Sequence, residues 1–196
     1  MNAPFLEKTA RPAGGALAGK RVALGVTGSI AAYKACEIVR LFVKAGAEVS
    51  VVMTESAQKF VTPLTFRTLS RRSVAVGMFD DPATWVPGHV SLAQWCDVLA
   101  IAPCTANAMA KVAHGIADDI LSSIALACRK PIVIAPAMNE GMLDSPATRA
   151  NIDTLRSRGV LVMDCGEGPL ACGTDGRGRM PEPSAVVAAV AEALGS

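Results

Sequence analysis

His89 is one of only two histidines in this chain of 196 residues, and its surroundings allow a chemical role. It lies in the stretch "GHVSLAQWCD", residues 88–97, where it is placed to begin a helix. An imidazole accepts or donates a proton near neutral pH, so His89 is a candidate acid or base. A lone histidine at a helix start is more often a capping or surface residue, and this stretch does not separate the two roles. His114, which precedes Gly115, is interpreted as an ordinary helix C-terminal residue.

The segment "GVTGSIAAYK", residues 25–34, follows an apolar run and opens a helical pattern. Backbone N–H groups and the helix dipole converge at such a turn, which makes it a candidate anion site. The segment lacks the G-x-G-x-x-G spacing, and the next apolar run ends in hydroxyl residues rather than in a useful acidic one. The pattern therefore favours a mononucleotide over NAD. The alternative is that Gly28 and Ser29 form only a tight turn and a helix cap.

A second candidate site follows another apolar run, in "APCTANAMAKVAHGIADD", residues 102–119. Thr105 and Asn107 are expected at the carboxyl end of a strand, where open α/β sheets bind their ligands. Ordinary helix capping by Thr105 explains the same residues equally well.

Residues 164–183, "DCGEGPLACGTDGRGRMPEP", contain too much glycine and proline for a regular element. A disordered linker is the default interpretation of such a segment. A linker has no need of Leu170, Cys172 and Met180, and a helical pattern follows directly. We therefore expect a functional flap at residues 165–181.

The composition excludes several classes of protein. Hydrophobic residues make up 51% of the chain and charged residues 18%, with a net charge of +2. The basic residues are scattered, so no nucleic-acid surface is expected. No apolar run approaches the roughly 18 residues of a membrane span, and no secretory signal is visible, so a cytoplasmic protein is expected. The six cysteines form no C-x-x-C pair or metal-like cluster, and apart from Cys172 they are interpreted as small buried hydrophobes.

Five short apolar runs without polar alternation predict strands covered on both faces, as in a parallel sheet: residues 21–26, 49–53, 98–102, 132–135 and 160–163. Helical patterns alternate with them at residues 30–46, 106–113, 119–127, 145–158 and 184–194. This order predicts the α/β class, a Rossmann-like (flavodoxin-like) doubly wound parallel sheet in a single domain. We expect a flexible N-terminal arm at residues 1–19 and the domain at residues 20–196.

Four segments together resemble a known family, the flavin-dependent cysteine decarboxylases. They are "GSIAAYK" (28–34), "HVSLAQWCD" (89–97), "PAMNEGM" (136–142) and "ACGTDGRGRM" (171–180). The last two are the specific ones, and the resemblance extends from about Lys20 to Pro183. It is strongest to the branch that acts on phosphopantothenoylcysteine in coenzyme A biosynthesis. It implies bound FMN and a homotrimeric site shared between subunits, often packed into a dodecamer. No metal site is expected, because the cysteines and histidines form no metal-like cluster.

The resemblance also implies roles for individual residues. The catalytic positions are His89, Asn139 and Cys172. Substrate contacts are expected from Asn139, Met142 and Arg179. Arg177 and Arg179 are the cations of the flap that could meet the substrate phosphate, and a solvated loop charge explains each of them equally well. The FMN contacts that the resemblance implies are Gly28, Ser29, Ile30, Thr54, Phe60, Thr105, Ala106, Asn107, Ala108 and Ala137.

The implied reaction converts 4'-phosphopantothenoylcysteine to 4'-phosphopantetheine. The flavin oxidises the carbon next to sulfur to a thioaldehyde, which allows loss of CO₂, and the resulting enethiolate is then reduced again. Asn139 is suited to bind the carboxylate without adding charge, and His89 to orient it or take the thiol proton. Cys172 is suited to return a proton during the final reduction, because a thiol with its ordinary pKa of about 8.5 is protonated at pH 7.

Two departures from the family pattern are visible. Leu143 stands where many members have tryptophan, and Asp118–Asp119 where an Asp–Asn pair is common. Three other functions remain open: a peptidyl-cysteine decarboxylase of ribosomal peptide maturation, a flavin prenyltransferase, and a non-catalytic regulatory flavoprotein. The flap argues against a peptidyl-cysteine decarboxylase. The His89 and P-x-M-N elements argue against a prenyltransferase, and the retained catalytic positions argue against a regulatory protein.

Overall fold

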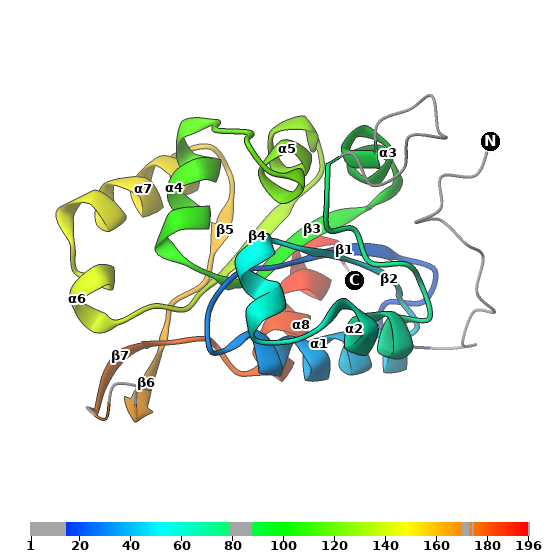
Figure 1. Ribbon diagram of the computed structural model, residues 1–196, viewed down its shortest axis with the longest axis horizontal. Coiled ribbons are helices and arrows are strands. Elements are labelled where there is room, and N and C mark those ends of the chain that lie inside the picture. The colour runs from blue at the N-terminus through cyan, green and yellow to red at the C-terminus, as the bar shows by residue number, and fades with distance from the viewer. Residues whose placement is uncertain (1–14, 79–87, 170–172, 174, 196) are drawn as a thin grey trace.

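A five-stranded parallel sheet forms the centre of the molecule (Figure 1). The computed structural model describes residues 15–78, 88–169, 173 and 175–195. The strands occur in the spatial order β2-β1-β3-β4-β5. Their bounds are β1 Arg21–Val26, β2 Glu48–Met53, β3 Val98–Cys104, β4 Ile132–Pro136 and β5 Leu161–Val162. This is the flavodoxin-like order, which confirms the predicted fold class.

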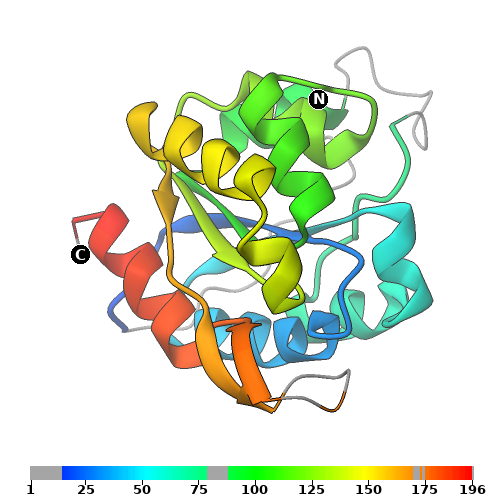
Figure 2. The same cartoon turned by 90° about the vertical axis from the view of Figure 1, so that its left-hand side faces the viewer.

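Helices cover both faces of the sheet, giving three layers (Figure 2). One face carries α1 (Ala32–Lys44), α2 (Pro63–Ser70) and α8 (Pro183–Ala193). The other carries α3 (Gly88–Trp95), α4 (Ala106–His114), α5 (Ile120–Ala127) and α7 (Pro146–Ser157). Successive residues of a strand point to opposite faces, so Leu24 packs under α1 while Ala23 faces the other layer. Because both faces are covered, β3 is buried along its whole length, which explains its continuous apolar sequence.

Four elements lie at or near the carboxyl ends of the strands, and none of them has a counterpart among the predicted strands and helices. They are the 3-10 helix η2 (Glu55–Lys59), the short helix α6 (Glu140–Leu143), and the strands β6 (Gly166–Pro169) and β7 (Asp175–Arg179). The strands β6 and β7 form an antiparallel hairpin within the predicted flap. The expectation that this segment is too rich in glycine for a regular element was therefore wrong. Gly168 and Gly178 have φ values of +129° and +121°, which only glycine adopts readily, so here glycine permits the hairpin.

The predicted N-terminal arm extends too far along the chain. Residues 15–19 form a turn in which Leu17 is fully buried, and the Leu17 N–H donates to the Ala45 carbonyl at 2.9 Å. The packed domain therefore includes Gly15 onward rather than starting at residue 20. No helix among the described residues is long and apolar enough to cross a membrane.

Candidate functional site

The carboxyl ends of β1 and β3 are joined by a buried threonine. Thr27 is 1% exposed, and its hydroxyl donates to the Pro103 carbonyl at 2.8 Å while accepting from the Thr105 N–H at 3.0 Å. The Thr27 N–H donates to the same carbonyl at 3.3 Å. These bonds hold together the two loops that the sequence identifies as ligand candidates, at the position between β1 and β3 where the winding of the sheet reverses.

The loop after β1 packs tightly against the loop after β2. A Cβ atom on Gly28 would collide with the Cβ of Ser56, so only glycine fits between the two segments. Helix α1 begins without a side-chain cap, and Ser29 instead accepts from the Ala31 N–H at 3.3 Å within the turn. The alternative that Gly28 and Ser29 form only a tight turn and a helix cap is therefore correct for the turn, but neither residue caps α1. Gly28, Ser29 and the uncapped start of α1 form a backbone surface of the kind that binds phosphate.

The loop after β2 supplies Thr54 and Phe60. Thr54 donates its N–H to the Val26 carbonyl at 3.1 Å, and its hydroxyl accepts from the Ala57 N–H at 3.3 Å as the cap of η2. Phe60, at the end of η2, is 48% exposed, and Ile30 in the neighbouring loop is 56% exposed. Two large apolar side chains at this edge of the sheet are therefore available to a ligand or to another subunit.

The loops after β3 and β4 supply the other predicted flavin contacts. Thr105 caps α4 by accepting from the Ala108 N–H at 3.3 Å, so the capping interpretation holds. The Ala137 N–H donates to the Cys104 carbonyl at 2.9 Å and aligns the two loops. Ala108 and Ala137 are 8% and 4% exposed, so they offer little contact area, whereas Ala106 is half-buried and Asn107 is exposed.

Asn139 is the N-cap of α6. Its Oδ1 accepts from the Gly141 N–H at 2.8 Å, which fixes the side chain at an exposed position directly after β4. This contact uses the amide oxygen, and the amide nitrogen is the donor end of the side chain. Met142, on the next turn, is 49% exposed. A neutral donor held by a cap in this way is suited to bind a carboxylate.

Arg179 lies at the end of the hairpin, near the start of α8. Among the described residues it forms one ion pair, and this pair is long, 3.8 Å from Nη2 to Glu182 Oε1. Glu182 Oε1 is closer to Lys34, whose Nζ lies 3.1 Å away. Arg179 is therefore weakly paired for a half-buried cation. Cys172, the third predicted catalytic residue, lies outside the described residues.

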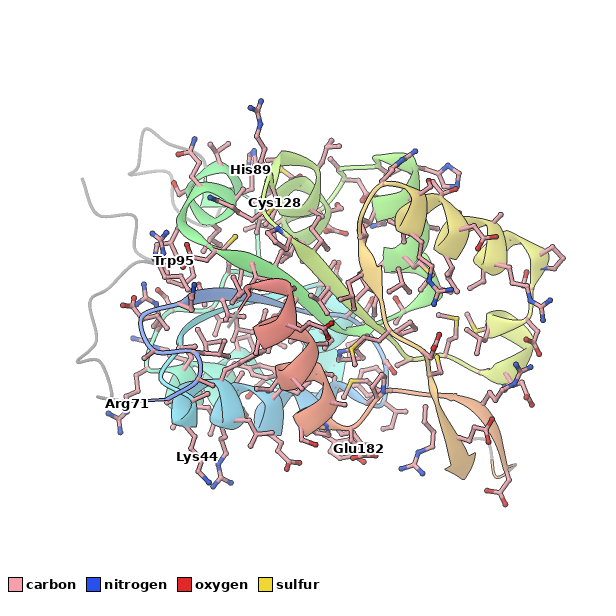
Figure 3. All side chains as sticks on the ribbon, turned by 180° about the vertical axis from the view of Figure 1, so that it is seen from behind. Lys44, Arg71, His89, Trp95, Cys128 and Glu182 are labelled. Atoms are coloured by element: carbon pink, nitrogen blue, oxygen red, sulfur yellow. The ribbon has the colours of Figure 1, made fainter. Side chains whose placement is uncertain are left out.

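His89 lies in the first turn of α3, and its Nδ1 is buried without a hydrogen-bond partner among the described residues. Figure 1 shows α3 and α6 toward opposite ends of the long axis of the molecule. Figure 3 shows His89 on the α3 side of the sheet and Glu182 on the other side. One chain therefore gathers the predicted flavin contacts and Asn139 at the carboxyl edge but keeps His89 apart from Asn139.

Two further cysteines lie near this edge, and both are poor nucleophiles. Burial raises the pKa of the Cys104 thiol to about 12. Burial, followed by the charge of Asp164, raises the pKa of Cys165 to about 11. Both thiols are protonated at pH 7, because burial outweighs the opposing charge of Arg177 at Cys165. In the described part of the chain, no group of three or more His, Cys, Asp or Glu residues could hold a metal ion.

Thr27 is the residue of this site that sequence reasoning missed. The available signal was a hydroxyl directly after a buried strand and before a glycine turn, in "GVTGS". Because its two partners are 76 and 78 positions away along the chain, no local pattern identifies them.

Thr27→Val should lower the free energy of unfolding by about 1–3 kcal/mol, because the isosteric side chain leaves the buried Pro103 carbonyl and Thr105 N–H with fewer partners. Urea denaturation measures the change. Thr65→Val, at an exposed position of α2, is the matched control and should stay within about 0.5 kcal/mol of the wild type. Equal stability of the two variants would show that the Thr27 hydroxyl does not stabilise the junction of β1 and β3.

Comparison with known proteins gives a consistent result. The family profile described as Flavoprotein matches residues 11–195. The coenzyme A biosynthesis bifunctional protein CoaBC of Haemophilus influenzae is 44% identical over 176 residues, which are 90% of this chain and 44% of that protein. The CoaBC protein of Bacillus subtilis is 47% identical over 168 residues, 86% of this chain and 41% of that protein. The chain thus spans less than half the length of these curated relatives.

Two solved structures with the same fold share about a third of the sequence. A PPC decarboxylase variant complexed with pantothenoylaminoethenethiol superposes with a TM-score of 0.82 at 33% identity, covering 90% of this chain and 99% of that one. The FMN-dependent cysteine decarboxylase SpaF superposes with a TM-score of 0.78 at 32% identity, covering 91% and 97%.

Proposed function

Because the chain belongs to the flavoprotein family, we propose that it is an FMN-dependent decarboxylase that converts 4'-phosphopantothenoylcysteine to 4'-phosphopantetheine. The observation that carries this proposal is the carboxyl edge of the sheet. There the glycine turn follows β1, Thr105 follows β3 and Asn139 follows β4, and these three strands are adjacent. The structural similarity to a PPC decarboxylase holding an enethiol supports the same substrate class.

The residues at this edge fit FMN. The Gly28 turn and the uncapped start of α1 would hold the phosphate with their backbone N–H groups. Only glycine fits at position 28, because a Cβ there would collide with Ser56. The segments that begin at Thr54 and Thr105 would flank the ring, and the exposed side chain of Asn107 lies in the first turn of α4, which begins directly after Thr105. Bound FMN would supply reversible two-electron oxidation at the substrate carbon next to sulfur.

The side chains of this chain would then bind the substrate and move protons. Asn139 donates its amide N–H groups to the carboxylate that is lost as CO₂. A neutral donor is appropriate because a cation would stabilise the ground-state carboxylate more than the transition state, in which that charge disperses. His89 orients the same carboxylate or takes the thiol proton, and Cys172 returns a proton to the product. The weakly paired Arg179 meets the substrate phosphate.

We further propose that the active site is completed between subunits of a homotrimer, alone or packed into a dodecamer. The separation of α3 from α6 within one chain supports this assembly, because His89 and Asn139 can act on one substrate only if they come from different copies. The exposed apolar side chains Ile30, Tyr33, Phe60 and Leu64, on α1, α2 and the loops beside them, offer area for a subunit contact.

The proposal is tested with the purified protein and two substrates, phosphopantothenoylcysteine and a peptide with a C-terminal cysteine. The protein should carry the visible absorbance of a flavin, and mass spectrometry should show loss of CO₂ from the small substrate. Cys172→Ser is the matched variant and should release CO₂ but accumulate the enethiol. A colourless protein would contradict the cofactor assignment. Decarboxylation of the peptide alone would identify a peptidyl-cysteine decarboxylase instead.

A further inference from the structure

The β6–β7 hairpin is attached to the loop that carries Asn139. The Met138 N–H donates to the Gly178 carbonyl at 3.0 Å. A Cβ on Gly178 would collide with the Met138 carbonyl oxygen, so the two backbones are in direct contact. A two-stranded hairpin is only marginally stable by itself, so its position depends on attachments of this kind.

Arg177 makes a second attachment between the hairpin and α6. Its Nε lies 3.3 Å from Glu140 Oε1, and its Nη2 donates to Asp144 at 3.0 Å (Oδ1) and 2.8 Å (Oδ2). The Arg177 backbone N–H also points to Glu140 Oε1, at 3.4 Å. Figures 1 and 2 show β7 beside α6, to which Glu140 belongs and which Asp144 follows. Arg177 therefore contacts both the carboxylate at the start of this short helix and the one directly after it.

The ion pairs of Arg177 belong to a cluster of four charged residues in which positive and negative charges are equal in number. Asp144 also accepts from Arg149 Nη2 at 2.9 Å, so two carboxylates are matched by two guanidinium groups. Arg149, followed by Arg177, holds the pKa of Asp144 below its usual range, so the cluster is ionised at neutral pH. Arg177 thus differs from Arg179, whose ion pair with Glu182 is 3.8 Å long.

We propose that Arg177 is a positioning residue, which fixes β7 against α6 through Glu140 and Asp144 and so sets the place of Asn139 relative to the hairpin. The inference rests on the proposed function and deepens it. It separates the two arginines of "GRGRM", with Arg177 as the structural attachment and Arg179 as the cation that meets substrate. The guanidinium is required because its planar fork engages two carboxylates at once, which a lysine ammonium does less well.

The experiment compares Arg177→Gln, Arg177→Lys and the control Arg149→Gln in the FMN-loaded protein. Hydrogen exchange of the Met138 amide, whose acceptor is on β7, reports the attachment without any activity assay. Arg177→Gln should accelerate this exchange about 3- to 10-fold, with Arg177→Lys intermediate, as expected for an exposed but bidentate ion pair. Arg149→Gln removes a partner of Asp144 from α7 rather than from the hairpin and should change the exchange less than about 2-fold.

Kinetics then separate positioning from phosphate binding. Arg177→Gln should lower kcat/KM by the same factor, about 3- to 10-fold, for phosphopantothenoylcysteine and for its dephosphorylated analogue. A loss confined to the phosphorylated substrate, or unchanged Met138 exchange, would overturn the proposal. Failure of the wild-type protein to release CO₂ would refute the proposed function, and the exchange rates would still show whether Arg177 attaches the hairpin.

Discussion

Replacing Gly28 with alanine should weaken FMN binding about 10- to 100-fold, the cost of forcing one methyl group into a closely packed position. The added Cβ would collide with the Ser56 Cβ and push apart the loops after β1 and β2. The sheet should remain folded, because Gly28 lies outside the strands. FMN content after gel filtration, and the dissociation constant from flavin fluorescence, measure the effect.

Ser56→Gly provides the matched control for this variant. It removes the atom with which the new methyl group collides, so Gly28→Ala/Ser56→Gly should recover most of the lost affinity. Ser56→Gly alone should bind FMN nearly as well as the wild type. If Gly28→Ala bound FMN normally, the turn after β1 would not be part of the flavin site.

Mixing two inactive variants should restore activity. His89→Asn and Asn139→Asp should each lower kcat at least about 100-fold, since each removes a group that contacts the reacting substrate. Aspartate keeps the helix cap of α6 but places a negative charge where the substrate carboxylate binds. In trimers assembled at random from equal amounts, about one quarter of the sites between subunits would combine an intact His89 with an intact Asn139.

Coexpression of the two variants with different tags, followed by purification over both tags, measures this complementation. The control is His89→Asn coexpressed with itself under the same two tags, which should stay inactive. Mixed oligomers that lack activity would show that His89 and Asn139 do not act together across a subunit boundary.

Much of the sheet could be predicted from the sequence because each strand is buried on both faces. Continuous apolar runs such as that of β3 therefore mark strands directly, and the predicted limits differ from the observed ones by at most two residues. The β6–β7 hairpin could not be predicted in this way. Gly168 and Gly178 adopt positive φ values in the hairpin, and its strands lack the apolar pattern that identifies the others.

The sequence predicted which segments form the site, but it did not predict the hydrogen bonds and ion pairs that hold these segments together. A local pattern indicated Thr105, which follows an apolar run and begins a helix, whereas Asn139 was indicated by the family resemblance of "PAMNEGM". Thr27 and the ion pairs of Arg177 depend on partners that are distant in the sequence, so only the folded chain reveals them. The same is true of the distance between α3 and α6, which makes a second subunit part of the proposed mechanism.

The brevity of β5 affects how this scaffold can diverge. Only Leu161 and Val162 pair with β4 before the chain leaves the sheet and turns toward the hairpin. Insertions or deletions between β6 and β7 therefore leave the register of the five parallel strands intact. The loops after β1 and β2 should not tolerate such changes, because a single methyl group added at Gly28 would already collide with Ser56. We therefore expect sequence changes to be tolerated in the hairpin more readily than in the loops proposed to hold the cofactor.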